Sequence, residues 1–180
     1  MPLERALLAE AMQRSGLLEE TIPAAAWRWI DTFIEAYGKA TNDAEAALPQ
    51  VAALRAESIV VPALALERLR NRHVVFFLDG VAQYVDAQAE LRGLPLEHDL
   101  GVIAEEFGLV RDDARWAVRM ALTGREDGPD LGLLFPLLGH ERILMRMGAI
   151  SSHLLHGRGL EPLKFGQGGV PFRTIEPHQS

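Results

Sequence analysis

The segment between Arg115 and Met147 contains the residues whose types and spacing could do chemistry. Arg119 lies shortly before a turn that carries Gly124, Gly128 and Pro129. Glycine and proline at these positions indicate two tight corners, which would bring backbone N–H groups and a helix N-terminus to one place. A guanidinium beside them could contact the edge of a base or stack on its face, while the amides hold an anion. The pattern is therefore suited to binding a phosphate or an unstacked nucleotide.

The residues next to this turn allow two interpretations of Arg119. Leu131 follows the turn and could pack on the ring of a bound base, which would complete a nucleotide site. Asp127 and Asp130 lie in the turn itself, and either could form an ion pair with Arg119 that has only a structural role. The residues alone leave both interpretations open.

Other catalytic and ligand-binding patterns are absent from the sequence. It has no glycine-rich phosphate loop ending in Lys-Ser or Lys-Thr, no Gly-x-Ser-x-Gly nucleophile elbow and no cysteine. His153 and His156 are three residues apart and could face one metal ion, with His140 a helix-length away, but no fourth ligand is suitably spaced. Their position near a helix C-terminus, where the dipole favours a cation, explains these histidines without a metal. We therefore expect neither a metal nor another cofactor.

Composition and charge limit the class of protein. The chain has 180 residues, 48% of them hydrophobic, which is enough for the core of one ordinary domain or two small subdomains. Its net charge of −7 argues against a general polyanion binder, but residues 111–180 carry nine basic and eight acidic side chains. Sixteen of the eighteen basic residues are arginine. This excess suits planar, bidentate contacts, but a codon-usage bias toward arginine explains it equally well. Without a signal peptide or an apolar run long enough to span a bilayer, the chain is expected to be cytoplasmic.

Hydrophobic spacing and helix-end signals predict an all-α protein of short helices. The first two helices are expected to end at Gly16 and Gly38. Asn42 with Glu45 has the spacing of a capping pair for a third helix, which Pro49 would kink or interrupt.

Two stretches in the middle of the chain need a choice between helix and strand. Residues 58–72 are predicted as a helix, with Pro62 tolerable only in its first turn. Residues 73–80 are rich in β-branched and aromatic side chains, yet a lone strand would have no partner, so they are predicted as buried helix.

In the second half, Asp99 is expected to cap a helix that ends at Gly108, and Asp112 or Asp113 a helix that ends at Gly124.

After Gly124, a short helix is expected to start at Pro129 and to be distorted by Pro136, before a break at Gly139. A helical stripe follows, made of Ile143, Met147, Ile150 and Leu154. These elements suggest an N-terminal helical subdomain over residues 1–98, a C-terminal one over 99–156 and an extended or disordered Gly/Pro-rich tail over 157–180.

The segment with Arg119 resembles a known family over about 33 residues. The matching runs are Val118–Gly124, then Pro129 and Leu131, then Leu137–Arg142, and finally Arg146. In order and spacing they are similar to the C-terminal anticodon-binding domain of bacterial glutamyl-tRNA synthetases, and valine for leucine at position 118 is a mild departure.

This resemblance implies an all-α cage that reads the anticodon loop of tRNA. It implies that Arg119 and Leu131 contact anticodon bases, and that Arg55 or Arg72 is the candidate for a further basic residue from the preceding subdomain. The candidate RNA-binding residues are Arg119, Thr123, Gly124, Arg125, Leu131, Arg142 and Arg146.

The expected partner is tRNA, with a glutamate tRNA as the candidate, or a tRNA synthetase. The family's two ATP-binding signatures do not occur in this sequence. If the chain is taken as complete from Met1, we expect that it cannot aminoacylate tRNA alone. The alternative is a protein-interaction or regulatory module in which RNA binding is lost. The acidic net charge favours it, as do Trp27 and Trp29, because two residues so close cannot both face one core.

Overall fold

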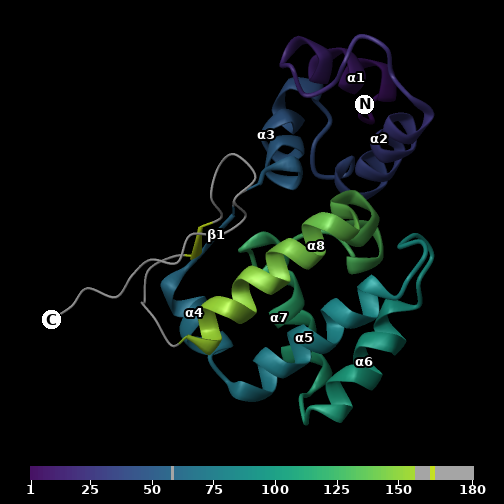
Figure 1. The fold of residues 1–180 in the computed structure, drawn as a ribbon. Coiled ribbons are helices and arrows are strands. Elements are labelled where there is room, and N and C mark those ends of the chain that lie inside the picture. Colours follow the sequence, from purple (N-terminus) through teal and green to yellow (C-terminus); the bar gives the residue numbers. More distant parts are fainter. Residues whose placement is uncertain (58, 157–162, 165–180) are drawn as a thin grey trace, which may run out of the picture. The chain divides into compact units, whose positions relative to one another are not determined.

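The computed structural model describes residues 1–57, 59–156 and 163–164, which form eight helices and two short strands (Figure 1). The predicted all-α class is confirmed. The chain divides into two compact units. The first consists of Met1–Ala56 and Pro129–Leu138, and the second of Glu57–Gly128 with the chain from Gly139 onward. These boundaries differ from those at residues 98 and 156 that the sequence suggested.

The first unit contains α1 (Arg5–Arg14), α2 (Ala24–Tyr37), α3 (Ala44–Arg55) and the first turns of α8 (Leu131–Leu155). Each helix turns a set of apolar side chains inward, and α1 packs on both α2 and α3. The third helix is capped by Asp43 rather than by Asn42, because the Asp43 carboxylate accepts from the backbone N–H groups of residues 45 and 46. Pro49 lies within α3 without ending it.

The two tryptophans of α2 both make contacts inside the first unit. The indole N–H of Trp29 donates to the Leu137 carbonyl at 2.8 Å, and its ring stacks on Phe33 with centroids 5.5 Å apart. The guanidinium of Arg5 lies 4.7 Å from the ring centroid of Trp27. Neither ring is therefore a bare apolar surface that would support the protein-interaction alternative.

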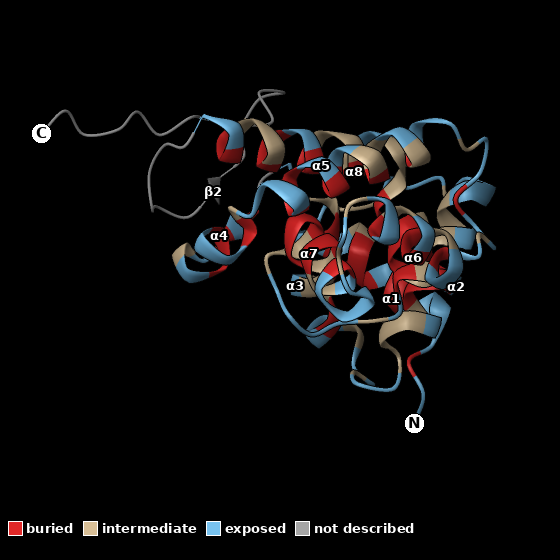
Figure 2. Cartoon of the chain, turned by 90° about the horizontal axis from the view of Figure 1, so that it is seen from below, coloured by how far each residue is buried: buried red, intermediate tan, exposed pale blue. Residues whose placement is uncertain are grey.

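The second unit is built around three mutually contacting helices (Figure 1). These are α5 (Arg72–Asp86), α6 (Leu96–Glu106) and α7 (Arg111–Thr123). Strand β1 (Val60–Val61), helix α4 (Ala63–Leu69) and the later part of α8 complete it. The predicted helix over residues 73–80 is confirmed as part of α5. Figure 2 shows that the helices carry both buried and exposed residues.

The predicted helix over residues 58–72 is wrong for residues 59–62 and for Asn71, which separates α4 from α5; residue 58 lies outside the described part. Val60 and Val61 form β1, and Pro62 is the N-cap of α4. Proline disfavours helical backbone at the residue before it, and β-branched side chains fit extended backbone. Strand β1 pairs antiparallel with β2 (Leu163–Lys164). The two residues of β2 belong to the tail that was predicted to be extended or disordered, and they are extended. Residues 157–162 and 165–180 lie outside the described part.

Three predicted helix starts, those of α6, α7 and α8, were also wrong. Helix α6 begins at Leu96, so Asp99 lies within it and accepts a 2.6 Å hydrogen bond from the hydroxyl of Tyr84. Helix α7 follows Val110, which places Asp112 and Asp113 in its first turn. Their negative charges still interact favourably with the helix dipole there.

Helix α8 begins two residues after Pro129, and the carboxylate of Asp130 accepts from the N–H of Gly132 at 2.8 Å. It has the predicted break at Gly139, whose φ of 79° and ψ of 164° are not helical. Beyond the break, the predicted apolar stripe is confirmed, because Ile143, Met147, Ile150 and Leu154 are all buried. No helix in the described part of the chain is both long and apolar enough to cross a membrane.

Candidate nucleic-acid interface

Helix α7 positions Arg119 at the edge of the second unit. The helix forms because small and apolar residues face the core, with Ala117, Val118 and Ala121 fully buried. Arg119 is partly buried and lies one turn before the helix end. The helix ends at Gly124, whose φ of 70° is left-handed and whose N–H donates to the Met120 carbonyl.

The end of α7 is pressed against strand β1. A Cβ atom at Gly124 would overlap the carbonyl oxygen of Val60. Both the backbone conformation and the close approach therefore require glycine at this position. The contact fixes where the corner after Arg119 lies within the second unit.

Hydrogen bonds and an ion pair order the turn that follows. The hydroxyl of Thr123 donates to the Arg119 carbonyl at 2.8 Å and accepts from the N–H of Arg125 at 3.2 Å. The guanidinium of Arg125 binds Asp127 with two bonds of 3.0 and 3.3 Å. These bonds lower the pKa of the exposed Asp127 carboxyl below its ordinary value. Of the two carboxylates considered as partners of Arg119, Asp130 bonds the backbone, and Asp127 bonds Arg125, with a smaller electrostatic effect of Arg119 on its pKa.

The side chain of Arg119 lies against the backbone of Gly128. A Cβ atom at Gly128 would be 2.9 Å from Nη1 of Arg119, and Gly128 has a φ of 150°. Because a larger residue would push the guanidinium away, Gly128 leaves the space in which Arg119 rests. A planar guanidinium beside an ordered turn is suited to bind base edges or phosphate.

A group that the sequence analysis missed adjoins this turn. The indole N–H of Trp116 donates to Glu126 at 3.1 Å, and the Arg68 guanidinium lies 3.8 Å from the Trp116 ring centroid. Arg68 is also paired with Asp113 at 3.2 Å. The signal in the sequence was the spacing of Trp116 and Arg119, since residues three apart are neighbours on a helix.

The remaining candidate residues differ from Arg119 and Arg125 in how far their side chains are buried. Arg146 is 1% exposed, and its Nη1 donates to the Leu122 carbonyl at 2.7 Å. Burial, with a smaller effect of Arg142, lowers the pKa of Arg146 to about 10. Arg142 is itself partly buried. Leu131 is 3% exposed and belongs to the first unit, whereas Arg119 belongs to the second.

The histidines do not gather into a site. Among residues 1–57 and 59–156, no group of three or more His, Asp or Glu side chains could hold a metal ion. Nε2 of His140 lies 2.7 Å from the Gln88 carbonyl oxygen, so that nitrogen carries the hydrogen and donates. His153 is buried and His156 is exposed.

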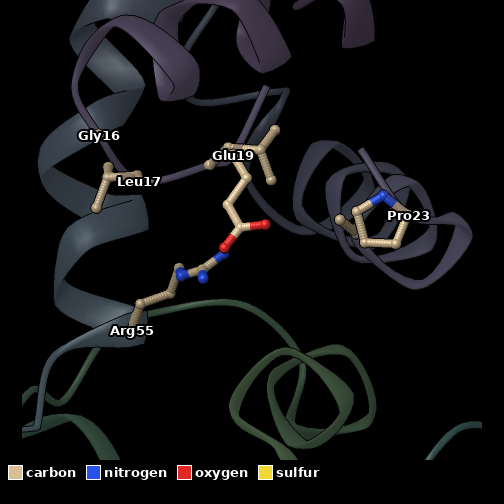
Figure 3. Close-up of a pocket in the computed structure, with 7 residues that line it drawn as sticks. Gly16, Leu17, Glu19, Pro23 and Arg55 are labelled. Carbon is tan, nitrogen blue, oxygen red and sulfur yellow. The ribbon is translucent and has the colours of Figure 1, made fainter. Parts of the chain in front are cut away.

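The first unit contains a separate pocket of about 390 Å³ at the end of α1. Its lining includes Leu17, Glu19, Pro23 and Arg55. The side chains of Glu19 and Arg55 point toward one another (Figure 3). The Arg55 guanidinium also lies 5.8 Å from the ring centroid of Trp29. The pocket thus combines one charge of each sign with apolar walls.

Comparisons with known proteins identify the family. The sequence model of the family described as "anticodon binding domain" matches residues 16–150. A glutamate–tRNA ligase of Alkaliphilus metalliredigens is 31% identical over 91 residues, which are 51% of this chain and 18% of that protein. Glutamate–tRNA ligase 2 of Bartonella bacilliformis is 55% identical over 31 residues, 17% of this chain and 7% of that protein. The chain therefore spans less than a fifth of either relative. With three quarters of its length matched, the chain belongs to the anticodon binding domain family.

Proposed function

We propose that this chain binds tRNA and reads its anticodon loop with the corner at the end of α7. The observation that carries the proposal is the family match over residues 16–150, which spans α7, the turn after it and the start of α8. The corner has suitable chemistry, because Arg119 presents planar donors next to a turn that Thr123 and Gly124 hold in place. Donors of this kind recognise base edges and phosphates.

We assign the candidate residues three different tasks. Arg119 contacts a base, and the exposed Arg125 and partly buried Arg142 contact the phosphate backbone. Arg146 is a positioning residue, because it is buried and bonds a carbonyl in the last turn of α7. Leu131 is nearly inaccessible in the free protein, so a contact between its side chain and a base requires an opening of the first turn of α8.

An anticodon-binding domain is a non-catalytic module. We infer that these 180 residues do not themselves aminoacylate tRNA, since neither ATP-binding signature of the synthetases occurs among them. The names of the two relatives support a glutamate tRNA or its synthetase as the partner. Such a partner favours a cytoplasmic location. The protein-interaction alternative is not favoured, because Trp27 and Trp29 already have contacts within the first unit.

Substitution of Arg119 tests the proposal. We expect Arg119→Ala to lower the discrimination between tRNA transcripts with cognate and altered anticodons by about 1–3 kcal/mol, the value of a bidentate base contact. Arg119→Lys keeps the charge but loses the planar fork, so it should lose most of the same discrimination. Filter binding at one fixed salt concentration measures both effects.

Arg28→Ala, an exposed arginine of α2, serves as the control for the loss of one positive charge. The proposal is wrong if the wild-type protein binds heparin as tightly as tRNA, or if Arg119→Ala behaves like Arg28→Ala with every transcript.

A further inference from the structure

We propose that Arg68 and Trp116 form a stacking platform for a second unpaired nucleobase, next to the one that Arg119 contacts. This inference rests on the proposed function and adds a binding site on α4 and α7 of the second unit. It starts from the short distance of 3.8 Å between the Arg68 guanidinium carbon and the centroid of the Trp116 ring. At this distance the guanidinium lies over the indole ring in a cation–π contact. Both guanidinium planes and indole rings are surfaces on which bases stack.

Both members of the pair are held in place before any ligand binds. The Trp116 indole N–H donates to Oε1 of Glu126, which fixes the plane of the ring. The Arg68 guanidinium is held by Oδ1 of Asp113 at 3.2 Å. A stacking surface that is already ordered loses less conformational entropy when a base binds.

The pair adjoins the corner of α7 rather than a remote face. Trp116 and Arg119 are neighbours on one side of the helix because they are three residues apart. Both also contact the same turn, Trp116 through Glu126 and Arg119 through its approach to Gly128. A nucleotide that follows the base at Arg119 would therefore meet this pair next.

The charges around the pair select a base over a phosphate. Asp113 and Glu126 place a carboxylate beside each member, and these would repel an anion. A neutral aromatic ring has no such penalty, and the Arg68 side chain, which is 51% exposed, is accessible to it. The ligand of this site is thus the face of a nucleobase.

The first unit contains a matched pair that serves as the control. Arg5 lies 4.7 Å from the ring centroid of Trp27, is paired with Asp31 at 3.2 Å and is 52% exposed. Substitutions of Arg5 and Trp27 change the same chemistry in the unit that does not contain α7.

The test compares Arg68→Lys, Arg68→Gln and Trp116→Leu with Arg5→Lys and Trp27→Leu in the full chain, using equilibrium binding of a tRNA transcript. Loss of base stacking should weaken binding about 5- to 150-fold for Trp116→Leu. Arg68→Lys and Arg68→Gln should both weaken it, by about 2- to 5-fold, because lysine keeps the charge but has no planar surface. The two Arg5 and Trp27 variants should bind as the wild type does.

The dependence on salt separates stacking from attraction to phosphate. The Arg68 and Trp116 variants should keep the wild-type slope of log affinity against log salt concentration. Arg125→Gln should make this slope less steep, by the amount that corresponds to the loss of about one phosphate contact. A second measurement places 2-aminopurine at successive positions of the anticodon loop. One position should be quenched by the wild type and not by Trp116→Leu, and circular dichroism checks that this variant is folded.

The outcomes distinguish this inference from the proposed function. If Arg119→Ala loses anticodon discrimination while the Arg68 and Trp116 variants bind normally, the platform is wrong and the proposed function stands. The platform would also be overturned if Arg68→Lys bound tRNA as tightly as the wild type while Arg68→Gln bound it more weakly. The charge of residue 68 alone would then explain the binding. If the wild type binds no tRNA, both are wrong.

Discussion

Arginines of this chain have different roles because they lie at different depths. Arg125 is exposed and bound to one carboxylate, so its charge is largely solvated. Arg146 is buried, and desolvation lowers its pKa. An ion that stays buried needs bonds to balance the lost hydration, and the Leu122 carbonyl supplies one. In the proposed function, Arg146 would therefore support the shape of the corner, and Arg125 would contact the RNA that approaches it.

The hydrogen bond from Tyr84 to Asp99 gives a prediction for stability against pH. Burial, together with the bond to Asp99, raises the pKa of the Tyr84 hydroxyl well above its ordinary value of 10. A pKa raised in the folded state stabilises the protein fully below pH 10, and this contribution is lost as the pH rises through the folded pKa. Tyr84→Phe should lower the free energy of unfolding by about 1.5–3 kcal/mol at pH 7.

Urea unfolding of the wild type and of Tyr84→Phe at several pH values checks this. The unfolded wild type begins to lose its phenol proton near pH 10, so the difference between the two proteins should shrink above that pH. A difference that stays constant from pH 8 to pH 11 contradicts the assignment.

At the residue scale, the sequence could predict contacts between residues of the site that are close along the chain. It could not predict contacts between residues that are far apart along the chain. Arg119, Thr123 and Gly124 are close in sequence, so a helix end brings them together without further knowledge. The burial of Arg146 depends on packing against α7, and no local pattern reports it. The space that Gly128 leaves for Arg119 was hidden for the same reason.

At the scale of elements, the contact between α7 and β1 sets the position of the corner. Gly124 and Gly108 both have a φ of 70° after a helix, but a Cβ at Gly108 would meet nothing within 4 Å. The two glycines therefore share a backbone requirement and differ in their surroundings.

Substitution of these two glycines measures the contact with β1. Gly108→Ala should destabilise the protein by about 1–2 kcal/mol, which is the strain of a left-handed L-residue. Gly124→Ala should cost the same strain and, in addition, about 1–3 kcal/mol for displacement of the Val60 carbonyl. Chemical denaturation of both variants gives the comparison, and equal losses would show that the approach to β1 is readily relaxed.

The elements also show why some predictions held and others did not. The helix over residues 73–80 could be predicted, because no other segment offered a partner for a strand there. Strand β1 could not, because its partner β2 lies about a hundred residues later and is only two residues long. The N-caps were misplaced by one to four residues, since an Asp in the first turn and an Asp at the cap both favour a helix start.

At the scale of the whole molecule, the chain leaves the first unit after Ala56 and returns to it at Pro129. The returning segment provides buried Leu134 and Phe135 and the carbonyl that accepts from Trp29. Because these groups complete the core of the first unit, residues 1–56 are not a self-sufficient domain.

A comparison of two fragments tests this. Residues 1–56 alone should show reduced helicity and no cooperative thermal transition by circular dichroism. Residues 1–56 joined through a flexible glycine–serine linker to residues 129–138 should recover both. A cooperative transition in the shorter fragment would contradict the prediction.

The hydrogen bond between Trp29 and Leu137 spans 108 residues, and this has a consequence during synthesis on the ribosome. Helices α1 to α3 leave the exit tunnel long before their missing segment is translated. At usual elongation rates, the interval between residues 56 and 138 is about 4–16 s. For that time the nascent chain carries uncovered apolar side chains, which is the state that molecular chaperones bind.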